Sequence, residues 1–178
     1  MRDPRSTLDI ALQAAEEGAK ILKKVRSSNE LNIQYKSEKD LVTLADIESE
    51  KAIISSIKAS FPDDLFLTEE SNSETPLSNF EGKALWIIDP VDGTTDYAHG
   101  HPHVGISIAC AWDGEIKVAV VCAPFYNETF TAIRDQGAFL NGKPISPRKI
   151  EKLSHALVAT GFAPNRPEAY LNSLVNKV

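Results

Sequence analysis

The feature that most constrains this chain is the stretch 86–97, in which an apolar run ends abruptly in two carboxylates and a Gly-Thr turn. The proline after Asp89 disfavours helical backbone at Asp89, so the run predicts a buried strand whose end Asp89 and Asp92 leave together. Gly93 and Thr94 predict a tight turn and a helix start, where backbone N–H groups lack intrahelical partners. Anions bind at such helix starts, and hard cations bind at such carboxylates. The stretch therefore predicts a metal-binding corner suited to a phosphate ester.

The same stretch has a second interpretation that needs no ligand. Asp and Gly are ordinary turn residues, and Asp-x-x-Asp-Gly-Thr is also compatible with a capped helix start that simply follows a strand. Short motifs match by chance often enough that one motif alone does not decide function. The choice between the two interpretations depends on the rest of the chain.

The charge balance restricts the partners of such a site. The chain has 178 residues, of which 42% are hydrophobic, and this is the composition of one globular domain with a sizeable core. The formal charge of −6 argues against nucleic acid as a primary ligand, because binding to phosphate backbones depends on clustered Lys and Arg. An acidic protein that handles phosphate esters must take positive charge from elsewhere, most simply from Mg²⁺.

The cysteines and the apolar segments indicate the compartment. If the Asp-Gly pair at 113–114 is a two-residue hairpin turn, Cys110 faces Lys117 and not Cys122, so no disulfide is expected. The longest apolar stretch, 118–122, is far too short to span a bilayer, and the N-terminus has no apolar leader. These observations predict reduced thiols, no membrane contact and a cytoplasmic location.

Periodicity predicts helices followed by a mainly antiparallel sheet. Apolar residues at helical spacing predict a first helix over 8–25, capped by Ser6 or Thr7, and a second over 47–61 that ends before Pro62. The second helix is expected to bury Ile47, Ile54, Ile57 and Phe61. Apolar or alternating runs separated by turn residues predict strands at 31–35, 65–67, 86–88, 104–112, 115–123, 129–133 and 156–161, with a reversal at 141–142 and a last helix over 171–178.

Acidic residues follow two of these strands at the point where each ends. Glu69 and Glu70 come directly after one short apolar strand, and Asp89 and Asp92 come after another. Neighbouring strand ends would bring these carboxylates together, where they repel one another unless divalent metal is bound. Metal there could polarise a phosphoryl oxygen and activate water, which is the chemistry of phosphate-ester hydrolysis. A solvated loop is the alternative for Glu69 and Glu70, because Glu is mostly exposed.

Four ordered motifs make the chain similar to a known family. The stretch 86–99 resembles the first signature of the inositol monophosphatase family of Mg²⁺-dependent, lithium-sensitive phosphatases. The segments 40–46, 68–71 and 139–142 agree with that family in the same order, so the resemblance runs from about residue 6 to residue 161. It implies an α/β layered sandwich, in an α+β arrangement of the sugar-phosphatase type, with a largely antiparallel sheet flanked by helices.

The resemblance implies a set of metal ligands at matching positions. Glu69 and Asp89 would hold a first Mg²⁺ together with the Val91 backbone carbonyl, and Asp89 and Asp92 would share a second. The Lys36 position resembles the family lysine near a third, more weakly held ion, and an ordinary surface lysine is the alternative there. Two or three Mg²⁺ ions are therefore expected.

The resemblance also implies the catalytic roles. Thr94, hydrogen-bonded to Asp46 and working with Glu69, resembles the family's device for orienting the attacking water. A hydroxyl between two carboxylates can pass a proton or hold a nucleophile in line, so the chemistry of these side chains agrees with this role. The Gly93 and Thr94 backbone N–H groups would receive the phosphate, and Asp92 would assist the leaving oxygen.

The chain departs from the family pattern in two respects. Asp and Tyr at 96–97 stand where members usually have Asn and Phe, which places an extra carboxylate near the site. The family also continues into a second α/β portion that supplies a further Asp ligand, and the pattern at 171–178 resembles the start of its mid-chain helix. Residues 1–178 are therefore expected to form a single domain, the N-terminal metal-binding portion, with the C-terminal portion absent. The alternating histidines at 99–103 are expected to form a structural loop.

The function implied by the resemblance is Mg²⁺-dependent hydrolysis of inositol monophosphate or a similar sugar or polyol phosphate. The Gly-Thr-Thr form of the motif and the following His-Gly-His-Pro look more like inositol-1-phosphatases than like bisphosphate nucleotidases. Fructose-1,6-bisphosphate and 3′-phosphoadenosine phosphates are alternative substrates. A truncated, weakly active homologue that serves as a binding or assembly subunit is the alternative function. The implied partners are the small phosphate ester and a second copy in a homodimer, with no nucleic acid and no membrane.

Overall fold

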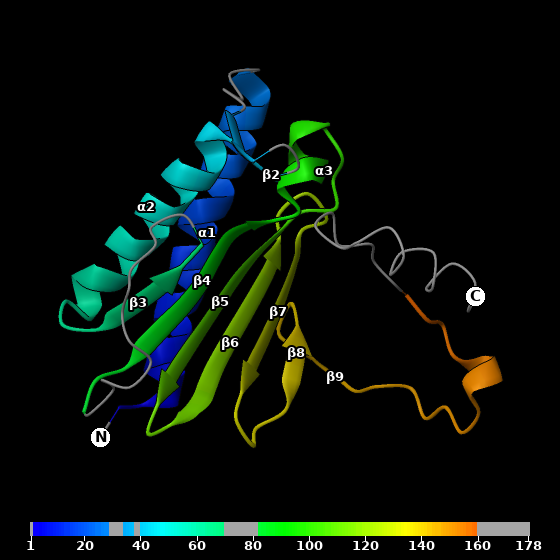
Figure 1. Ribbon diagram of the computed structural model, residues 1–178. Coiled ribbons are helices and arrows are strands. Elements are labelled where there is room, and N and C mark those ends of the chain that lie inside the picture. Colours follow the sequence, from blue (N-terminus) through cyan, green and yellow to red (C-terminus); the bar gives the residue numbers. More distant parts are fainter. Residues whose placement is uncertain (1, 29–33, 38–39, 70–81, 160–178) are drawn as a thin grey trace.

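The computed structural model describes residues 2–28, 34–37, 40–69 and 82–159. Their elements, labelled in Figure 1, are α1 (Pro4–Ser28), β1 (Gln34–Ser37), β2 (Asp40–Val42), α2 (Leu44–Ser60), β3 (Leu65–Thr68), β4 (Leu85–Asp92), α3 (Thr94–Ala98), β5 (Gly105–Trp112), β6 (Glu115–Ala123), β7 (Glu128–Ile133), β8 (Ala138–Leu140), β9 (Lys143–Ile145) and a 3₁₀ turn at Leu153–His155.

The main sheet has the order β3-β4-β5-β6-β7-β8-β9, and β1 pairs with β2 in a separate two-stranded sheet. Only β3 and β4 are parallel, and every other neighbouring pair is antiparallel. Figure 1 shows α1 and α2 side by side along one face of this sheet, and α3 at the end of β4 beside β2. The expected layered α/β arrangement, with a largely antiparallel sheet flanked by helices, is confirmed.

The core lies between the two long helices and the central strands. Ile106, Ile108 and Cys110 alternate along β5 and are buried on the face that the helices cover. The helices approach closely at Gly18, where an added Cβ would lie 2.8 Å from Ser49 Oγ and 2.9 Å from a methyl of Ile53. A larger residue at position 18 would therefore push α1 away from α2 and the sheet.

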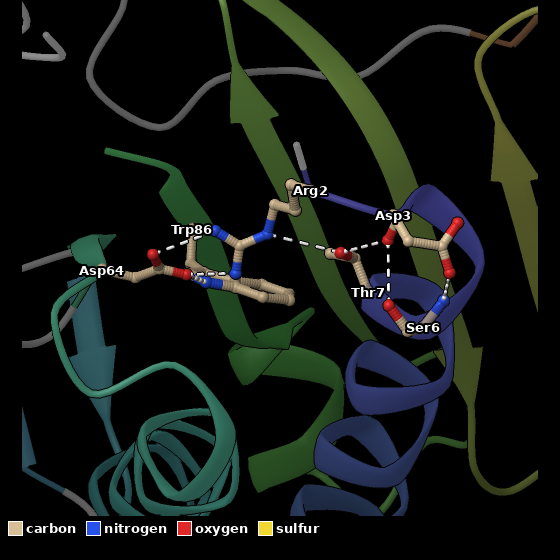
Figure 2. A network of polar contacts seen from close by, with 6 residues as sticks. All are labelled: Arg2, Asp3, Ser6, Thr7, Asp64 and Trp86. Carbon is tan, nitrogen blue, oxygen red and sulfur yellow. Dashed lines mark hydrogen bonds and ion pairs between the residues drawn. The ribbon is translucent and has the colours of Figure 1, made fainter. Parts of the chain in front are cut away.

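The N-terminus is anchored by a polar network at the start of β4 (Figure 2). Arg2 donates from Nη1 to Asp64 Oδ1 at 2.9 Å and forms an ion pair with the other carboxylate oxygen. The Trp86 indole donates to the same carboxylate at 2.7 Å, and the guanidinium carbon lies 3.8 Å from the centre of the Phe61 ring. A largely buried carboxylate thus has both of its oxygens satisfied within the chain.

Both helix predictions need correction in detail. The first helix begins at Pro4, and Asp3 caps it by accepting from the Arg5 and Ser6 N–H groups, whereas Ser6 or Thr7 had been expected to cap it. Proline suits the first helical position, because an N–H there would have no intrahelical partner, and the helix can therefore begin at Pro4. The second helix buries a more polar face than expected: Ile47 is 36% exposed, and the buried residues are Ala45, Asp46, Ser49, Glu50, Ile53 and Ile57.

The hairpin that joins β5 and β6 has the expected turn but a shifted register. Asp113 and Gly114 both have positive φ, as a two-residue turn of this kind requires. A bulge after Cys110 pairs that residue with Val118, so the expected pairing with Lys117 is wrong by one position. Both thiols are free, as predicted, and both are buried.

The last described segment differs from its prediction. Residues 156–159 form no strand, and Leu157 is 98% exposed. The predicted helix at 171–178 lies outside the described residues, as do 160–161. The predicted strand at 31–35 is represented by β1, which begins three residues later. No helix within the described ranges is long and apolar enough to cross a membrane.

Candidate metal centre

The strand that carries the two aspartates continues further than the sequence predicted. β4 runs to Asp92, and Asp89 pairs with Ser107 while Asp92 pairs with Gly105. Three steps on β4 therefore match two steps on β5, which defines a bulge of one extra residue. Side chains three apart on a regular strand point to opposite faces, so the bulge is what allows both carboxylates to face the same side. Pro90 occupies this irregular segment, where a missing N–H is tolerated.

The turn after β4 requires glycine for two reasons. Gly93 has φ +95°, in the left-handed region that side chains rarely adopt. A Cβ at this position would also lie 2.7 Å from the His103 carbonyl oxygen. The chain then enters α3 at Thr94, as the sequence predicted. The turn is thus packed directly against the loop that follows α3.

The Thr94 hydroxyl lies between two acceptors. Its Oγ1 is 3.0 Å from Asp46 Oδ1 and 3.0 Å from the Val91 carbonyl oxygen, and both can accept its one proton. Thr94 and Asp46 are 48 positions apart, so this contact joins the start of α3 to the start of α2. The hydrogen bond between Thr94 and Asp46 that the resemblance implied is present in the structure.

Asp46 is held rigidly by the N-terminus of α2. It is 1% exposed, and its Oδ2 accepts from the Thr43 N–H at 2.9 Å and from the Thr43 hydroxyl at 2.5 Å. These contacts form a capping box, which leaves Oδ1 to face Thr94. Sequence reasoning missed Thr43, although a Thr three residues before an acidic residue at a helix start is the signal for such a box.

Asp89 lies in an acidic environment. It is half-buried, and the loss of solvent around it raises the pKa of its carboxyl, with the charges of Asp92 and Asp46 acting in the same direction. A hydrogen bond with Glu69 and another from the Val91 N–H, 3.1 Å from Oδ1, oppose that rise without reversing it. Glu69 follows β3, and β3 and β4 are parallel neighbours, so their ends meet at one sheet edge as expected.

The carboxylates fit a hard cation by their chemistry. They offer only oxygen atoms, the ligands that Mg²⁺ prefers. Among the described residues no Lys or Arg forms an ion pair with Asp89 or Asp92. The described side chains do not, however, converge into a ready cage, because no group of three or more His, Cys, Asp or Glu among them has metal-binding geometry. The fit therefore depends on donor type and charge, not on a preformed cage.

The other site predictions have mixed outcomes. The side chains of Lys36 and Glu70 lie outside the described part of the structure, so nothing tests them. Asp92 is exposed, and the partly exposed Asp96 lies in the first turn of α3. In the histidine loop, the exposed His101 and His103 rings stack with centroids 5.8 Å apart, and Tyr126 hydrogen-bonds His103.

Comparison with known proteins gives a consistent set of similarities. Residues 3–177 match the family model described as "Inositol monophosphatase family". The chain is 36% identical to inositol monophosphatase 2 of Solanum lycopersicum over 173 residues, covering 96% of this chain and 64% of that protein. It is 37% identical to Nus factor SuhB of Escherichia coli over 172 residues, covering 96% of this chain and 63% of that protein.

Solved structures give the same result. The inositol monophosphatase of Thermotoga maritima is similar with a TM-score of 0.67 and 35% identity, covering 79% of this chain and 53% of that one. The extragenic suppressor protein suhB of Bartonella henselae is similar with a TM-score of 0.70 and 31% identity, covering 78% of this chain and 53% of that one. The chain spans 57–64% of the length of the curated relatives it matches.

Proposed function

This chain belongs to the inositol monophosphatase family, and from that membership we propose that it acts as a Mg²⁺-dependent phosphomonoesterase on inositol monophosphate or a similar sugar or polyol phosphate. The observation that carries the proposal is the Thr94 hydroxyl, hydrogen-bonded to Asp46 within the same acidic cluster as Asp89. A hydroxyl fixed beside a half-buried carboxylate that no described Lys or Arg pairs with is the arrangement that metal-assisted hydrolysis needs. Two or three ions are proposed.

The proposed metal ligands are Glu69, Asp89, Asp92 and the Val91 carbonyl. Bound Mg²⁺ would supply Lewis-acid stabilisation of the negative charge on the phosphoryl group. The Asp89 carboxylate is partly desolvated and has acidic neighbours. A bound cation would offset the desolvation cost of its charge and would reduce the repulsion from Asp92 and Asp46. The Val91 carbonyl oxygen lies 3.0 Å from Thr94 Oγ1, and when the Thr94 proton is directed to Asp46 its lone pairs can face an ion. The Lys36 position is proposed to lie near the third ion.

Thr94 and Asp46 are proposed to orient the attacking water. When the Thr94 proton is directed to Asp46, the hydroxyl oxygen is left as an acceptor for a water proton. Glu69 is proposed as the second acceptor, so that the water oxygen is held in line with the phosphorus. The Gly93 and Thr94 N–H groups are proposed to bind the phosphate, and Asp92 to assist the leaving oxygen.

The substrate class is proposed from family membership and the form of the motif. The Gly-Thr-Thr sequence followed by His-Gly-His-Pro favours an inositol-1-phosphate-like monoester. Fructose-1,6-bisphosphate and 3′-phosphoadenosine phosphates are the alternatives to include in any assay. A cytoplasmic homodimer without nucleic-acid or membrane ligands is proposed as the working form, and its mass in solution can be measured by light scattering.

Phosphate release from a panel of these esters, with Mg²⁺ or with a chelator, tests the proposal. The 178-residue chain should be assayed beside a version extended through any downstream coding sequence. Mg²⁺-dependent release that is highest with inositol monophosphate is expected from at least the extended version. Equal, metal-independent background in both versions would reject the phosphatase proposal.

A binding or assembly subunit is the second candidate function. Some relatives are named as Nus factors and not as phosphatases, and the described side chains form no ready metal cage. This candidate is supported if neither version releases phosphate while the folded chain still forms a stable complex with itself or another protein.

A further inference from the structure

The last turns of α1 hold the loop that follows α3. Arg26 donates from Nη1 to the His101 carbonyl at 3.1 Å and from Nη2 to the Gly100 carbonyl. Its guanidinium carbon also lies 4.4 Å from the centre of the Phe125 ring. The planar guanidinium can make both hydrogen bonds and the ring contact at once, which a lysine cannot do. Arg26 therefore fixes the backbone of this loop relative to α1.

Tyr97 fixes α3 to the same part of α1. The side chain is fully buried, its hydroxyl donates to the Leu22 carbonyl at 2.7 Å, and its ring packs against Phe125 with centroids 6.3 Å apart. The hydroxyl is protonated at physiological pH like that of any tyrosine, and burial raises its pKa further, to about 12. Leu22 and Arg26 are one helical turn apart, so both anchors belong to one helix end.

The loop transmits this anchoring to the turn beside the carboxylates. The His103 carbonyl lies so close to the Gly93 backbone that a Cβ there would be 2.7 Å from its oxygen. Gly93 in turn directly precedes Thr94, whose hydroxyl contacts Asp46. A shift of the loop would therefore move the Gly93 backbone, and with it the hydroxyl that faces the acidic cluster.

Resting on the function proposed above, we propose that Arg26 and Tyr97 are positioning residues that hold the Gly93–Thr94 turn in its working geometry. Arg26 acts through the loop at 99–103, and Tyr97 acts through α3, in which its N–H donates to the Gly93 carbonyl at 2.9 Å. Neither side chain belongs to the proposed metal or phosphate ligands. Their effect should thus be on phosphate binding and turnover, and not on the first metal. Small displacements of catalytic groups, of about 1 Å, can cost up to about 100-fold in rate.

The test compares Arg26→Gln with Lys24→Gln, which removes the same charge from an exposed position on the same helix. For Arg26→Gln we expect amide hydrogen exchange at residues 93–95 to become about tenfold faster. Affinity for inorganic phosphate and kcat/KM should each fall about tenfold, while Mg²⁺ affinity changes by less than about twofold. Lys24→Gln should leave all four quantities unchanged, and Arg26→Lys should restore part of the loss.

Tyr97→Phe is the second variant, because it removes only the hydroxyl and keeps the ring that packs on Phe125. It should give a smaller change in the same four quantities, even if Arg26→Gln proves too unstable to study. A lower melting temperature with unchanged exchange at residues 93–95 in both variants would overturn the inference. If the wild-type chain hydrolyses no ester, the proposed function fails, and the exchange and phosphate-binding measurements still decide whether these residues position the turn.

Discussion

Carboxylates in opposite electrostatic situations lie beside the two ends of β4. At the Trp86 end, Asp64 accepts from Arg2 and from the indole, and Arg2 also lies over the Phe61 ring. At the other end, Asp89 is half-buried among acidic neighbours, and burial raises the pKa of its carboxyl. Among the described residues no cationic side chain forms an ion pair with it. Within the described part of the chain, the Asp64 carboxylate thus has a cationic partner, whereas the Asp89 carboxylate has acidic neighbours and no paired Lys or Arg.

This difference separates a structural acidic residue from a candidate functional one. A carboxylate that stabilises the fold is expected to have its cation and donors within the chain, as Asp64 does. Carboxylates that are clustered without such partners cost folding free energy, which is tolerated when a ligand supplies the missing charge. The predictions below test whether the two ends are distinct in this way.

The largest effect is expected from Asp89→Asn. The change removes a proposed ligand of two ions, so Mg²⁺ affinity measured by calorimetry should fall by at least about 100-fold. Without metal, the variant should be at least as stable as the wild type at neutral pH, because it no longer buries a charge whose pKa is raised. Asp113→Asn, in a hairpin turn that suits Asn, is the control. Unchanged Mg²⁺ affinity in Asp89→Asn would refute the assigned ligand.

A smaller effect is expected from removing the hydroxyl of Thr94. Thr94→Val keeps the shape of the side chain but cannot bond Asp46, so turnover should fall about 100-fold, while Thr94→Ser should retain most activity. Mg²⁺ affinity should be unchanged in both. Thr7→Val is the matched control, because Thr7 is equally a hydrogen-bonded threonine but belongs to the Arg2 network. If Thr7→Val lowers turnover as much as Thr94→Val, the two ends are not functionally distinct.

The third effect concerns stability at the Trp86 end. Among the described residues, Arg2→Gln leaves the largely buried Asp64 with the Trp86 indole as its one side-chain donor, so the free energy of unfolding should fall by about 2 kcal/mol. The double change Arg2→Gln with Asp64→Asn should recover part of this loss, because no unpaired charge remains. Urea titration measures the stability, and Mg²⁺ calorimetry is the second readout. A fall in Mg²⁺ affinity in Arg2→Gln would contradict the separation of the two ends.

The sequence predicted the fold class and most turns because those features depend on local patterns. Asp113 and Gly114 define a hairpin by their backbone preferences alone. The register beyond such a turn was wrong by one residue, because the bulge after Cys110 depends on packing across β5 and β6. The buried face of the second helix was predicted only in part for a related reason: Ile57 is buried as expected, but Ile47 is 36% exposed. Its buried face contains Asp46, whose partner Thr94 is 48 positions away.

The candidate site was found from its motif, and the structure adds the contacts that hold it in place. The bulge between Asp89 and Asp92 could not be predicted, because it appears only when β4 pairs with β5. The role of Thr43 had a local signal in its spacing from Asp46. The contact of Arg26 with the loop at 99–103 had no local signal in the sequence, because the residues it joins are 74 and 75 positions apart.

The last effect is confined to alkaline pH, where each end of β4 has one buried group beside it that can lose a proton. Cys110 pairs with Trp86 across the strands, and burial raises the pKa of its thiol to about 12, as it does for the Tyr97 hydroxyl near the other end. An unfolded chain ionises these groups above pH 9–10, while the folded chain keeps their protons. The stability they contribute is therefore complete below pH 9 and is lost as the pH rises toward 12.

Cys110→Ala and Tyr97→Phe should each make the fall in stability above pH 9 less steep, by up to about 1.4 kcal/mol per pH unit for one proton. Urea midpoints at several pH values between 8 and 11 measure that slope. Saturating Mg²⁺ should raise the urea midpoints of both variants by the same amount as in the wild type, because neither the Cys110 thiol nor the Tyr97 hydroxyl is a proposed metal ligand. A slope unchanged by Cys110→Ala would mean that the thiol is accessible to solvent, and the Trp86 end would then be less tightly packed than its contacts indicate.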